Sequence, residues 1–279
     1  MSHKPLALGA ITSMGEALEE VRAMGIATVQ LQYPPHLDTP AGVVAIKAAS
    51  AQSGVEITVV FCGFAGESYA DIPAVRATVG LVPPATRAER VEMTLRIARF
   101  AASLGVSRVA AHIGFIPESP REPLYQELVA TVRGICDELA SRDQMFLLET
   151  GQETASGLKE FLESVARPNL RVNFDPANMV LYGQDPPLEA LETLFPFVES
   201  VHCKDGLWPT QTEQLGVEVP FGEGDIEATK WLNKLLELGY LGPLTIEREI
   251  QGPARTRDIL GAKTLIESVL NKRAMQEAR

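Results

Sequence analysis

Four short apolar segments in the second half of the chain each run into a side chain that can bind a metal ion. The segments and the residues that follow them are 146–148 with Glu149, 170–174 with Asp175, 198–201 with His202 and 244–246 with Glu247. Each segment is rich in residues that favour strands, and each gives way to a polar loop that contains Gly or Pro. If the segments are strands of one parallel barrel, their last side chains meet at the mouth of that barrel.

Three carboxylates and one imidazole form a donor set that is mostly oxygen. This set suits a divalent ion such as Mn²⁺, with Mg²⁺, Co²⁺ or Fe²⁺ as alternatives, better than it suits a structural zinc bound by thiolates. Any one of these acids alone would also be explained as a helix N-cap or a surface charge. Four such groups at successive strand ends favour a metal site, because those strands would be neighbours around the mouth.

The whole chain alternates strand and helix patterns, as a barrel requires. Strands are predicted at 6–11, 28–33, 56–64, 107–115, from 145, at 170–174, 198–201 and 242–249. Helices are predicted at 14–24, 39–53, 87–103, 123–141, 156–165, 187–194, 226–238 and 253–274, and the stretch 66–86 as a long functional loop. Eight βα units predict a single-domain (β/α)₈ TIM barrel over residues 1–279, since about 250 residues are typical. A doubly wound open sheet is the alternative, but no Gly-rich phosphate motif follows a strand.

Composition narrows the set of partners. The net charge of −11 argues against a nucleic-acid partner, because nucleic-acid-binding proteins usually present a basic face. No stretch approaches the roughly 20 apolar residues of a membrane span, and the first residues lack the apolar region of a signal peptide. The three cysteines, Cys62, Cys136 and Cys203, predict no disulfide framework. We therefore expect a cytoplasmic protein with a small-molecule substrate, and a homo-oligomer is compatible with the sequence.

Longer motifs around the four residues resemble those of the xylose isomerase-like TIM barrels. They are FLLE ending at Glu149, NFDPAN at 173–178, VHCKD at 201–205, GEGD at 222–225 and GYLGPLTIE ending at Glu247. The resemblance covers nearly the whole chain, and its superfamily includes sugar and sugar-phosphate isomerases and epimerases, inosose dehydratase and endonuclease IV. It implies that Glu149, Asp175, His202 and Glu247 are metal ligands. In the ketose 3-epimerase branch, the residues that match Glu149 and Glu247 are also the acid/base pair.

Such a pair fits the chemistry of epimerisation. Removal of a proton α to a carbonyl needs a base within hydrogen-bond reach and a positive charge near the enediolate that forms. A bound metal ion supplies that charge as a Lewis acid. Carboxylates on opposite sides of the substrate plane would remove the proton from one face and return it to the other, whereas one base on one face gives aldose–ketose isomerisation. The sequence predicts a metal-dependent isomerase or epimerase of a sugar or keto-sugar.

Two places depart from the epimerase pattern. Asn178 stands where the epimerases place a His that contacts substrate, and the loop 203–208 lacks the Arg usual after the ligand His. The His-x-Lys-Asp form of that loop looks more like inosose dehydratase. A metal-dependent lyase that dehydrates a keto-polyol therefore stays open as the alternative. An endonuclease IV-like phosphodiesterase is less favoured, because its trinuclear site uses several histidines and this chain has only four.

Four further residues are candidates for substrate binding: His112, Asn178, Lys204 and Trp208. Two of them have equally simple structural explanations, because Lys204 could pair with Asp205 or Glu223 and Trp208 could be plain packing. His112, at a predicted strand end, points either into the mouth or into the packed interior.

Three acidic residues have mainly structural interpretations. Glu67 is expected to be a solvated charge in the long loop, and Asp225 is expected to cap a helix that begins near residue 226. Strand alternation places Glu249 on the same side as Glu247, where it could support the site.

Overall fold

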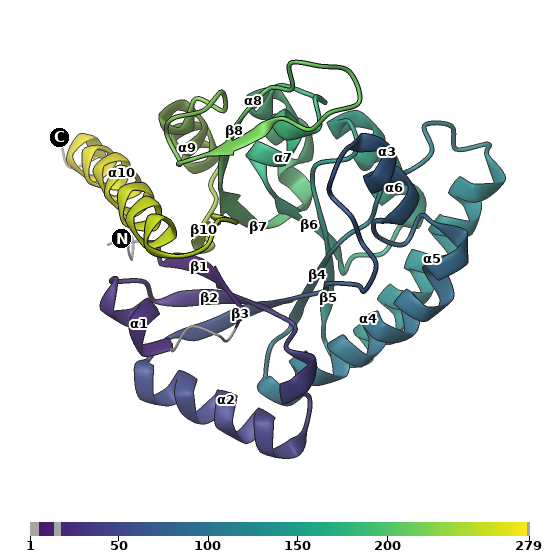
Figure 1. Cartoon of the computed structure of the whole chain (residues 1–279), viewed down its shortest axis with the longest axis horizontal. Helices are drawn as coiled ribbons and strands as arrows, with labels where there is room; N and C mark the ends of the chain where they lie inside the picture. The colour runs from purple at the N-terminus through teal and green to yellow at the C-terminus, as the bar shows by residue number, and fades with distance from the viewer. Residues whose placement is uncertain (1–5, 14–17, 278–279) are drawn as a thin grey trace.

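Eight parallel strands close into a barrel (Figure 1). The computed structural model describes residues 6–13 and 18–277. The barrel strands are β1 (Leu8–Thr12), β2 (Thr28–Gln32), β3 (Glu56–Phe61), β4 (Arg108–His112), β5 (Met145–Glu149), β6 (Leu170–Phe174), β7 (Val198–Cys203) and β10 (Leu244–Ile246). β10 pairs in parallel with both β7 and β1, which closes the sheet. The predicted TIM barrel is therefore confirmed, and the open doubly wound sheet is wrong.

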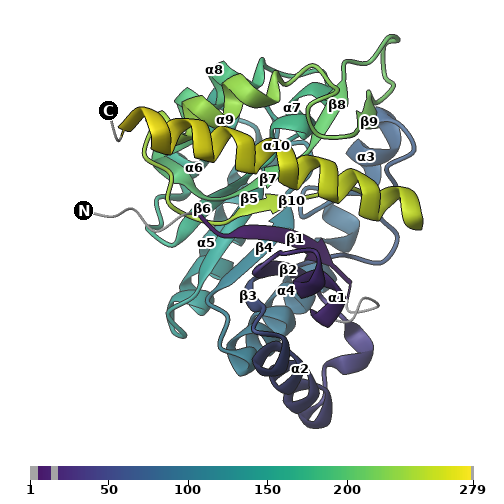
Figure 2. The ribbon, with the colours of Figure 1, turned by 90° about the vertical axis from the view of Figure 1, so that its left-hand side faces the viewer.

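Helices alternate with the strands and cover the outside of the barrel (Figures 1 and 2). They are α1 (Leu18–Ala23), α2 (Pro40–Ser53), α3 (Ile72–Thr78), α4 (Pro84–Leu104), α5 (Pro123–Ala140), α6 (Ala155–Val165), α7 (Pro176–Leu181), α8 (Pro187–Leu194), α9 (Ala228–Glu237) and α10 (Pro253–Glu277), with 3₁₀ turns at Pro35–Leu37 and Phe195–Phe197. Many of these helices begin with Pro, whose fixed φ suits the first helical turn. The predicted cap of α2 is confirmed, because the hydroxyl of Thr39 accepts a hydrogen bond from the Gly42 amide at 3.0 Å.

The predicted loop 66–86 was the least accurate part of the sequence interpretation. It contains α3, and α4 begins at Pro84 rather than at residue 87. Asp71 caps α3, since its Oδ1 accepts from the Ala74 amide at 2.8 Å. Of the predicted helix 14–24, residues 14–17 lie outside the described residues, and α1 covers most of the rest.

The connection after β7 also holds structure that the sequence interpretation missed. A two-stranded antiparallel hairpin, β8 (Asp205–Leu207) with β9 (Val217–Val219), follows the barrel strand. The predicted cap at Asp225 is wrong, because α9 begins at Ala228 and Glu227 occupies its N-cap with a φ of 54°. The Asp225 carboxylate instead accepts a hydrogen bond from the backbone amide of Trp208 at 3.1 Å, so it ties this connection together.

The interior of the barrel is divided into an apolar half and a polar half. The apolar half is a small cluster of its own, formed by Val59, Phe61, Ala110 and Leu147. The polar half consists of buried residues from β2, β6, β7 and β10, namely Thr28, Gln30, Asn173, Ser200 and Thr245. Barrels of this type are usually filled by bulky branched side chains, so the polar half indicates a role other than packing alone.

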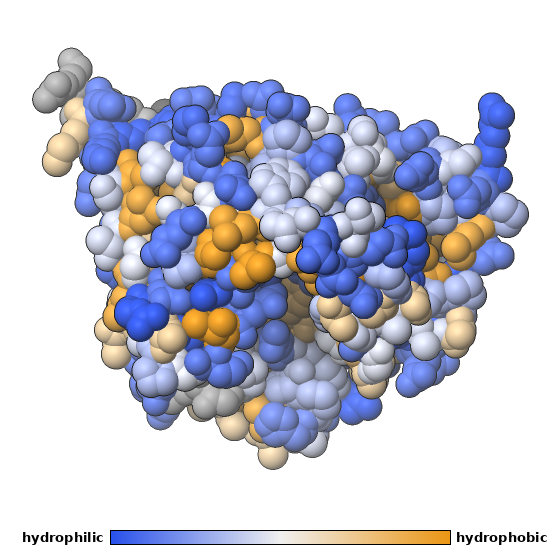
Figure 3. All heavy atoms as spheres, turned by 45° about the horizontal axis from the view of Figure 1, so that its top comes forward, coloured by the Kyte–Doolittle hydropathy of each residue, from blue (hydrophilic) through white to orange (hydrophobic). Residues whose placement is uncertain are grey.

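The face in Figure 3 is mostly hydrophilic, with apolar side chains in small separate groups. Within the described residues, no helix combines the length and the apolar character needed to cross a membrane.

Candidate metal centre

The four predicted ligands lie at the C-terminal ends of neighbouring strands. Glu149 is the last residue of β5, His202 lies near the end of β7, and Asp175 and Glu247 directly follow β6 and β10. These four strands are consecutive in the closed sheet. The barrel therefore gathers in one place side chains that are far apart in the sequence.

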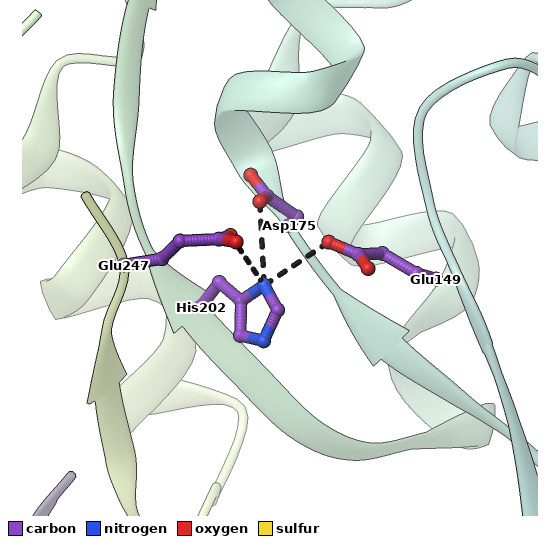
Figure 4. A group of neighbouring side chains, drawn as sticks. All are labelled: Glu149, Asp175, His202 and Glu247. Carbon is purple, nitrogen blue, oxygen red and sulfur yellow. Dashed lines mark hydrogen bonds and ion pairs between the residues drawn. The ribbon is translucent and has the colours of Figure 1, made fainter. Parts of the chain in front are cut away.

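One ring nitrogen of His202 is the point on which the cluster converges (Figure 4). Its Nδ1 atom lies close to one oxygen of each carboxylate: 3.1 Å from Glu149 Oε1, 3.3 Å from Asp175 Oδ2 and 2.9 Å from Glu247 Oε2. All four donor atoms lie within 4.8 Å of one another. A single N–H group cannot donate well to three carboxylates, whereas four donor atoms this close together suit a bound cation.

The negative charges of the three carboxylates also favour a bound cation. Burial acts to lower the pKa of His202, but the Glu247 and Glu149 carboxylates outweigh it and hold that pKa well above its ordinary value. Burial acts to raise the pKa of Glu247, but the charges of Lys204 and His202 lower it overall. Three carboxylates out of water need positive charge between them, which an imidazolium or a bound metal ion supplies.

The available lone pairs fit a divalent metal ion. Among the described residues, Oε2 of Glu247 has no partner in hydrogen-bonding geometry, although Nδ1 of His202 is 2.9 Å away. Three carboxylate oxygens and one imidazole nitrogen suit Mn²⁺, Mg²⁺, Co²⁺ or Fe²⁺. The cluster is therefore a candidate site for a divalent cation.

The far side of the His202 ring meets the polar half of the barrel interior. Nε2 lies 2.9 Å from Oε1 of Gln30 and 3.0 Å from Nδ2 of Asn173. An imidazole that binds a cation through Nδ1 carries its proton on Nε2, and Oε1 of Gln30 is placed to accept that proton. Asn173 holds Gln30 in turn, because its Oδ1 accepts from Nε2 of Gln30 at 3.2 Å and from the hydroxyl of Ser200.

Asp175 combines a structural role with its place in the cluster. Its Oδ1 accepts hydrogen bonds from the amides of Ala177 at 2.8 Å and Asn178 at 3.1 Å, which caps α7. Its Oδ2 faces His202. The Thr150 hydroxyl fixes the backbone here, because it accepts from the Asp175 amide and donates to the Asp175 carbonyl, both at 2.8 Å. Helix capping thus orients the second oxygen toward the cation site.

Three of the four predicted substrate-binding residues lie beside the cluster. Nε2 of His112 is 3.2 Å from Oε2 of Glu149, and Nδ2 of Asn178 donates to Oε1 of the same carboxylate at 3.1 Å. Lys204 is 3% exposed and pairs with Glu249, and its Nζ also lies 3.5 Å from Oε2 of Glu247. The two pairings suggested from the sequence, with Asp205 and Glu223, are absent among the described contacts, because the hairpin turns Asp205 toward backbone amides.

Trp208 does not join the others. It lies 36% exposed in the connection between β8 and β9, away from the residues that line the cavity over the cluster. That cavity has a volume of about 550 Å³ and is bounded by His112, Asn178, Lys204, Glu67, Tyr69 and Tyr182. Tyr69 and Tyr182 were not singled out in the sequence, because they come from connections whose path depends on the fold.

Glu67 holds part of the wall of this cavity, so it is not the solvated charge that the sequence suggested. Its two oxygens accept from the backbone amides of Phe64 at 3.2 Å and Gly80 at 2.8 Å. The buried guanidinium of Arg90 donates to the carbonyl of Gly80 at 2.6 Å. Gly80 itself has a φ of 74°, and a Cβ there would lie 2.2 Å from the backbone of Ile113. The wall is therefore fixed by close backbone packing.

The fold and the cluster together define a (β/α)₈ barrel with a candidate metal centre at its C-terminal end. The model of the family described as xylose isomerase-like TIM barrel matches residues 18–268, and the chain belongs to this family. No curated protein matches the sequence.

Solved structures give the same result for the fold. A xylose isomerase domain protein from Planctomyces limnophilus is 43% identical, with 97% of this chain and 99% of that chain covered and a TM-score of 0.93. A D-tagatose 3-epimerase-like protein is 20% identical, with coverages of 97% and 99% and a TM-score of 0.76. A xylose isomerase-like TIM barrel protein from Mycobacterium smegmatis, in complex with magnesium, is 16% identical, with coverages of 96% and 97% and a TM-score of 0.71. Further matches at 15–17% identity include ketose 3-epimerases and a probable 3-DHS dehydratase from Bacillus anthracis.

Proposed function

We propose that this protein is a metal-dependent isomerase or epimerase of keto-sugars that works by removing a proton α to a carbonyl. The observation that carries the proposal is the position of Glu149 and Glu247 on opposite sides of the point where the donor atoms converge (Figure 4). A substrate held between them would present one face to each carboxylate. This is the arrangement that inversion at a carbon needs.

Different neighbours orient the carboxylates of Glu149 and Glu247. Glu149 is fixed by His112 and Asn178, which contact its two oxygens. Glu247 lies beside the Lys204 ammonium, and its lowered pKa keeps it ionised at neutral pH, where it can accept a proton. A divalent cation held by Glu149, Asp175, His202 and Glu247, with Mn²⁺ the first choice and Mg²⁺, Co²⁺ or Fe²⁺ as alternatives, would act as a Lewis acid toward the developing enediolate charge.

The cavity suits a small polyhydroxylated substrate. Its polar side chains offer hydrogen bonds, and the aromatic rings of Tyr69 and Phe61 offer apolar surface to a sugar face. Its two arginines are engaged within the protein, since Arg248 pairs with Glu218 and Asp258, and Arg255 donates to the carbonyls of Arg248 and Ile11. A substrate without phosphate therefore fits best.

The decisive experiment is deuterium exchange from D₂O into a panel of ketoses, followed by NMR of the products. E149Q and E247Q keep the shape of each side chain but remove its basicity, and each is expected to slow epimerisation by about 10²–10⁴-fold. Glu163, exposed on α6, supplies the control E163Q, which should exchange like the parent. If both active-site variants keep full turnover, the acid/base assignment is wrong.

A dehydratase on the same scaffold is the second candidate. The observation in its favour is the buried Lys204 ammonium, whose Nζ lies 3.4 Å from Oδ1 of Asn178 at the position where epimerases place a His. The match to a probable 3-DHS dehydratase supports the same choice. Both reactions begin with removal of an α-proton, so the products separate them: a dehydratase couples exchange to the loss of water.

A further inference from the structure

A second cavity lies at the N-terminal end of the barrel, opposite the candidate metal centre. It has a volume of about 750 Å³ and is bounded by the first residues of several strands and by the loop 239–243 before β10. In TIM barrels this end is ordinarily the structural end, and catalysis takes place at the other. The proposed function therefore gives this cavity no role.

One arginine in the cavity wall differs from its neighbours in its contacts. Arg171, on β6, is partly buried, and its guanidinium makes no hydrogen bond or ion pair among the described residues. Its neighbour in the wall, Arg108, is by contrast neutralised by Glu199, with contacts of 2.8 and 2.6 Å. A guanidinium that is partly withdrawn from water and left unpaired costs free energy, so a half-buried Arg usually has an anionic partner.

A second unused donor lies in the same wall. Thr245, on β10, is buried, and its hydroxyl makes no hydrogen bond among the described side chains, whereas the hydroxyls of Thr28 and Thr58 donate to backbone carbonyls. Glu56 also borders the cavity, but it is exposed at the rim, where water solvates a carboxylate at little cost. The buried part of the wall thus offers donors, and its unpaired charge is positive.

The rest of the wall is apolar enough to contact a carbon skeleton. Phe195, Leu241 and Pro243 border the cavity, and Leu241 is 77% exposed. A wholly inorganic ion would leave these side chains without contacts in a space of this size. An organic molecule that carries one negatively charged group would use both the donors and the apolar rim.

We propose that this cavity is a second binding site, for a small organic oxyanion, with the Arg171 guanidinium as its charged anchor and the Thr245 hydroxyl as an additional donor. The planar guanidinium binds a carboxylate or a phosphate through two parallel hydrogen bonds. The site is separate from the metal cluster, so a test of this proposal does not depend on the proposed reaction.

Calorimetric titration of the purified protein with butanoate and with methyl phosphate tests the proposal. We expect one binding event for at least one probe, with an affinity that falls about 10–100-fold in R171Q. The loss should be smaller in R171K, which keeps the positive charge but not the planar pair of N–H donors. The matched control is R22Q, because Arg22 on α1 also makes no ion pair within the described part of the chain but is exposed on a helix. R22Q removes the same charge and should bind both probes like the parent.

The outcomes distinguish a carboxylate ligand from a phosphate ester, and they show whether the proposal is wrong. Binding of butanoate alone assigns an organic carboxylate, and binding of methyl phosphate alone assigns a phosphate ester. T245V replaces the hydroxyl by a methyl group of similar size and is expected to weaken the same event by about tenfold, which keeps the test open if R171Q does not fold. No binding of either probe, equal binding to the parent and both cavity variants, or an equal loss in R22Q overturns the proposal.

Discussion

Oε1 of Gln30 on β2 lies 2.9 Å from Nε2 of His202 on β7, so two residues 172 positions apart meet inside the barrel. This contact matters when Nδ1 binds a cation, because the ring then carries its proton on Nε2, where Oε1 of Gln30 is placed to accept it. A hydrogen bond from Nε2–H to Gln30 would leave the Nδ1 lone pair available to a cation held with the three carboxylates. The polar half of the barrel interior thus contacts the candidate metal centre through the His202 ring.

The first prediction concerns this contact. Q30L removes the acceptor while keeping a similar volume, and it is expected to weaken divalent-metal affinity by about 10–100-fold, because the tautomer and the ring orientation are no longer fixed. Calorimetric titration with Mn²⁺ measures the effect. The control is Q144L, since Gln144 is equally buried but hydrogen-bonds to the carbonyls of Ala98 and Val106 outside the site. Equal affinity in Q30L and the parent would falsify this role.

The second prediction concerns the metal ligands themselves. D175N and H202A are expected to contain far less metal than the parent after purification, measured by elemental analysis, because H202A loses one of four donors and D175N loses one of the negative charges at the site. Chelation should lower the unfolding temperature of the parent and leave that of the two variants nearly unchanged, since a ligand stabilises only a protein that binds it. D205N serves as the control, because Asp205 is buried but accepts from the backbone amides of Gly206 and Gly222. Full metal content in H202A would contradict the assignment.

The four candidate ligands could be found from the sequence because each occupies a strand end, a position that a linear pattern reveals. Eight alternating units then implied that those ends meet. The partners of His202 could not be found in this way. Alternation along β2 shows that Gln30 faces inward, but its contact with His202 exists only once the sheet has closed through β1 and β10.

Local helices were missed for a different reason. Asp175 and Pro176 read as a strand end followed by a loop, yet together they cap and start α7. The same pairing of an N-cap with an early Pro occurs at Asp71 and Pro73, where it starts α3 inside the predicted loop. Short helices lack the long apolar periodicity that identifies a helix in sequence. Only an N-cap residue and an early Pro indicate where such a helix begins.

The third prediction concerns the cavity wall. G80A is expected to destabilise the fold by several kcal/mol, because Gly80 has a φ of 74° and its new Cβ would lie 2.2 Å from the backbone of Ile113. G134A is the opposite case: Gly134 lies within α5 with open space around it, so Ala should stabilise the protein by about 0.5–1 kcal/mol. Urea unfolding of both variants gives the comparison. A parent-like stability of G80A would show that the wall can move.

The last prediction concerns the pH dependence of stability. Glu153, in the loop after β5, is 7% exposed and forms no salt bridge among the described residues. Burial raises its pKa from 4.5 to about 8, although backbone amides of Glu153 and Ile116 act in the opposite direction. Between pH 4.5 and 8 the unfolded chain loses this proton while the folded chain keeps it. The contribution of Glu153 to the free energy of unfolding therefore falls as the pH rises through that window and levels off above it.

E153Q removes this dependence, because the amide is neutral at every pH. At about 1.4 kcal/mol for each pKa unit, the variant should exceed the parent in stability by about 3 kcal/mol at pH 7, and the two should converge near pH 4.5. Urea unfolding at pH 5, 7 and 8.5 tests this, with E163Q as the control for an exposed Glu on α6. Parallel pH profiles for E153Q and the parent would show that the buried carboxyl finds a partner in solution and ionises near its ordinary pKa.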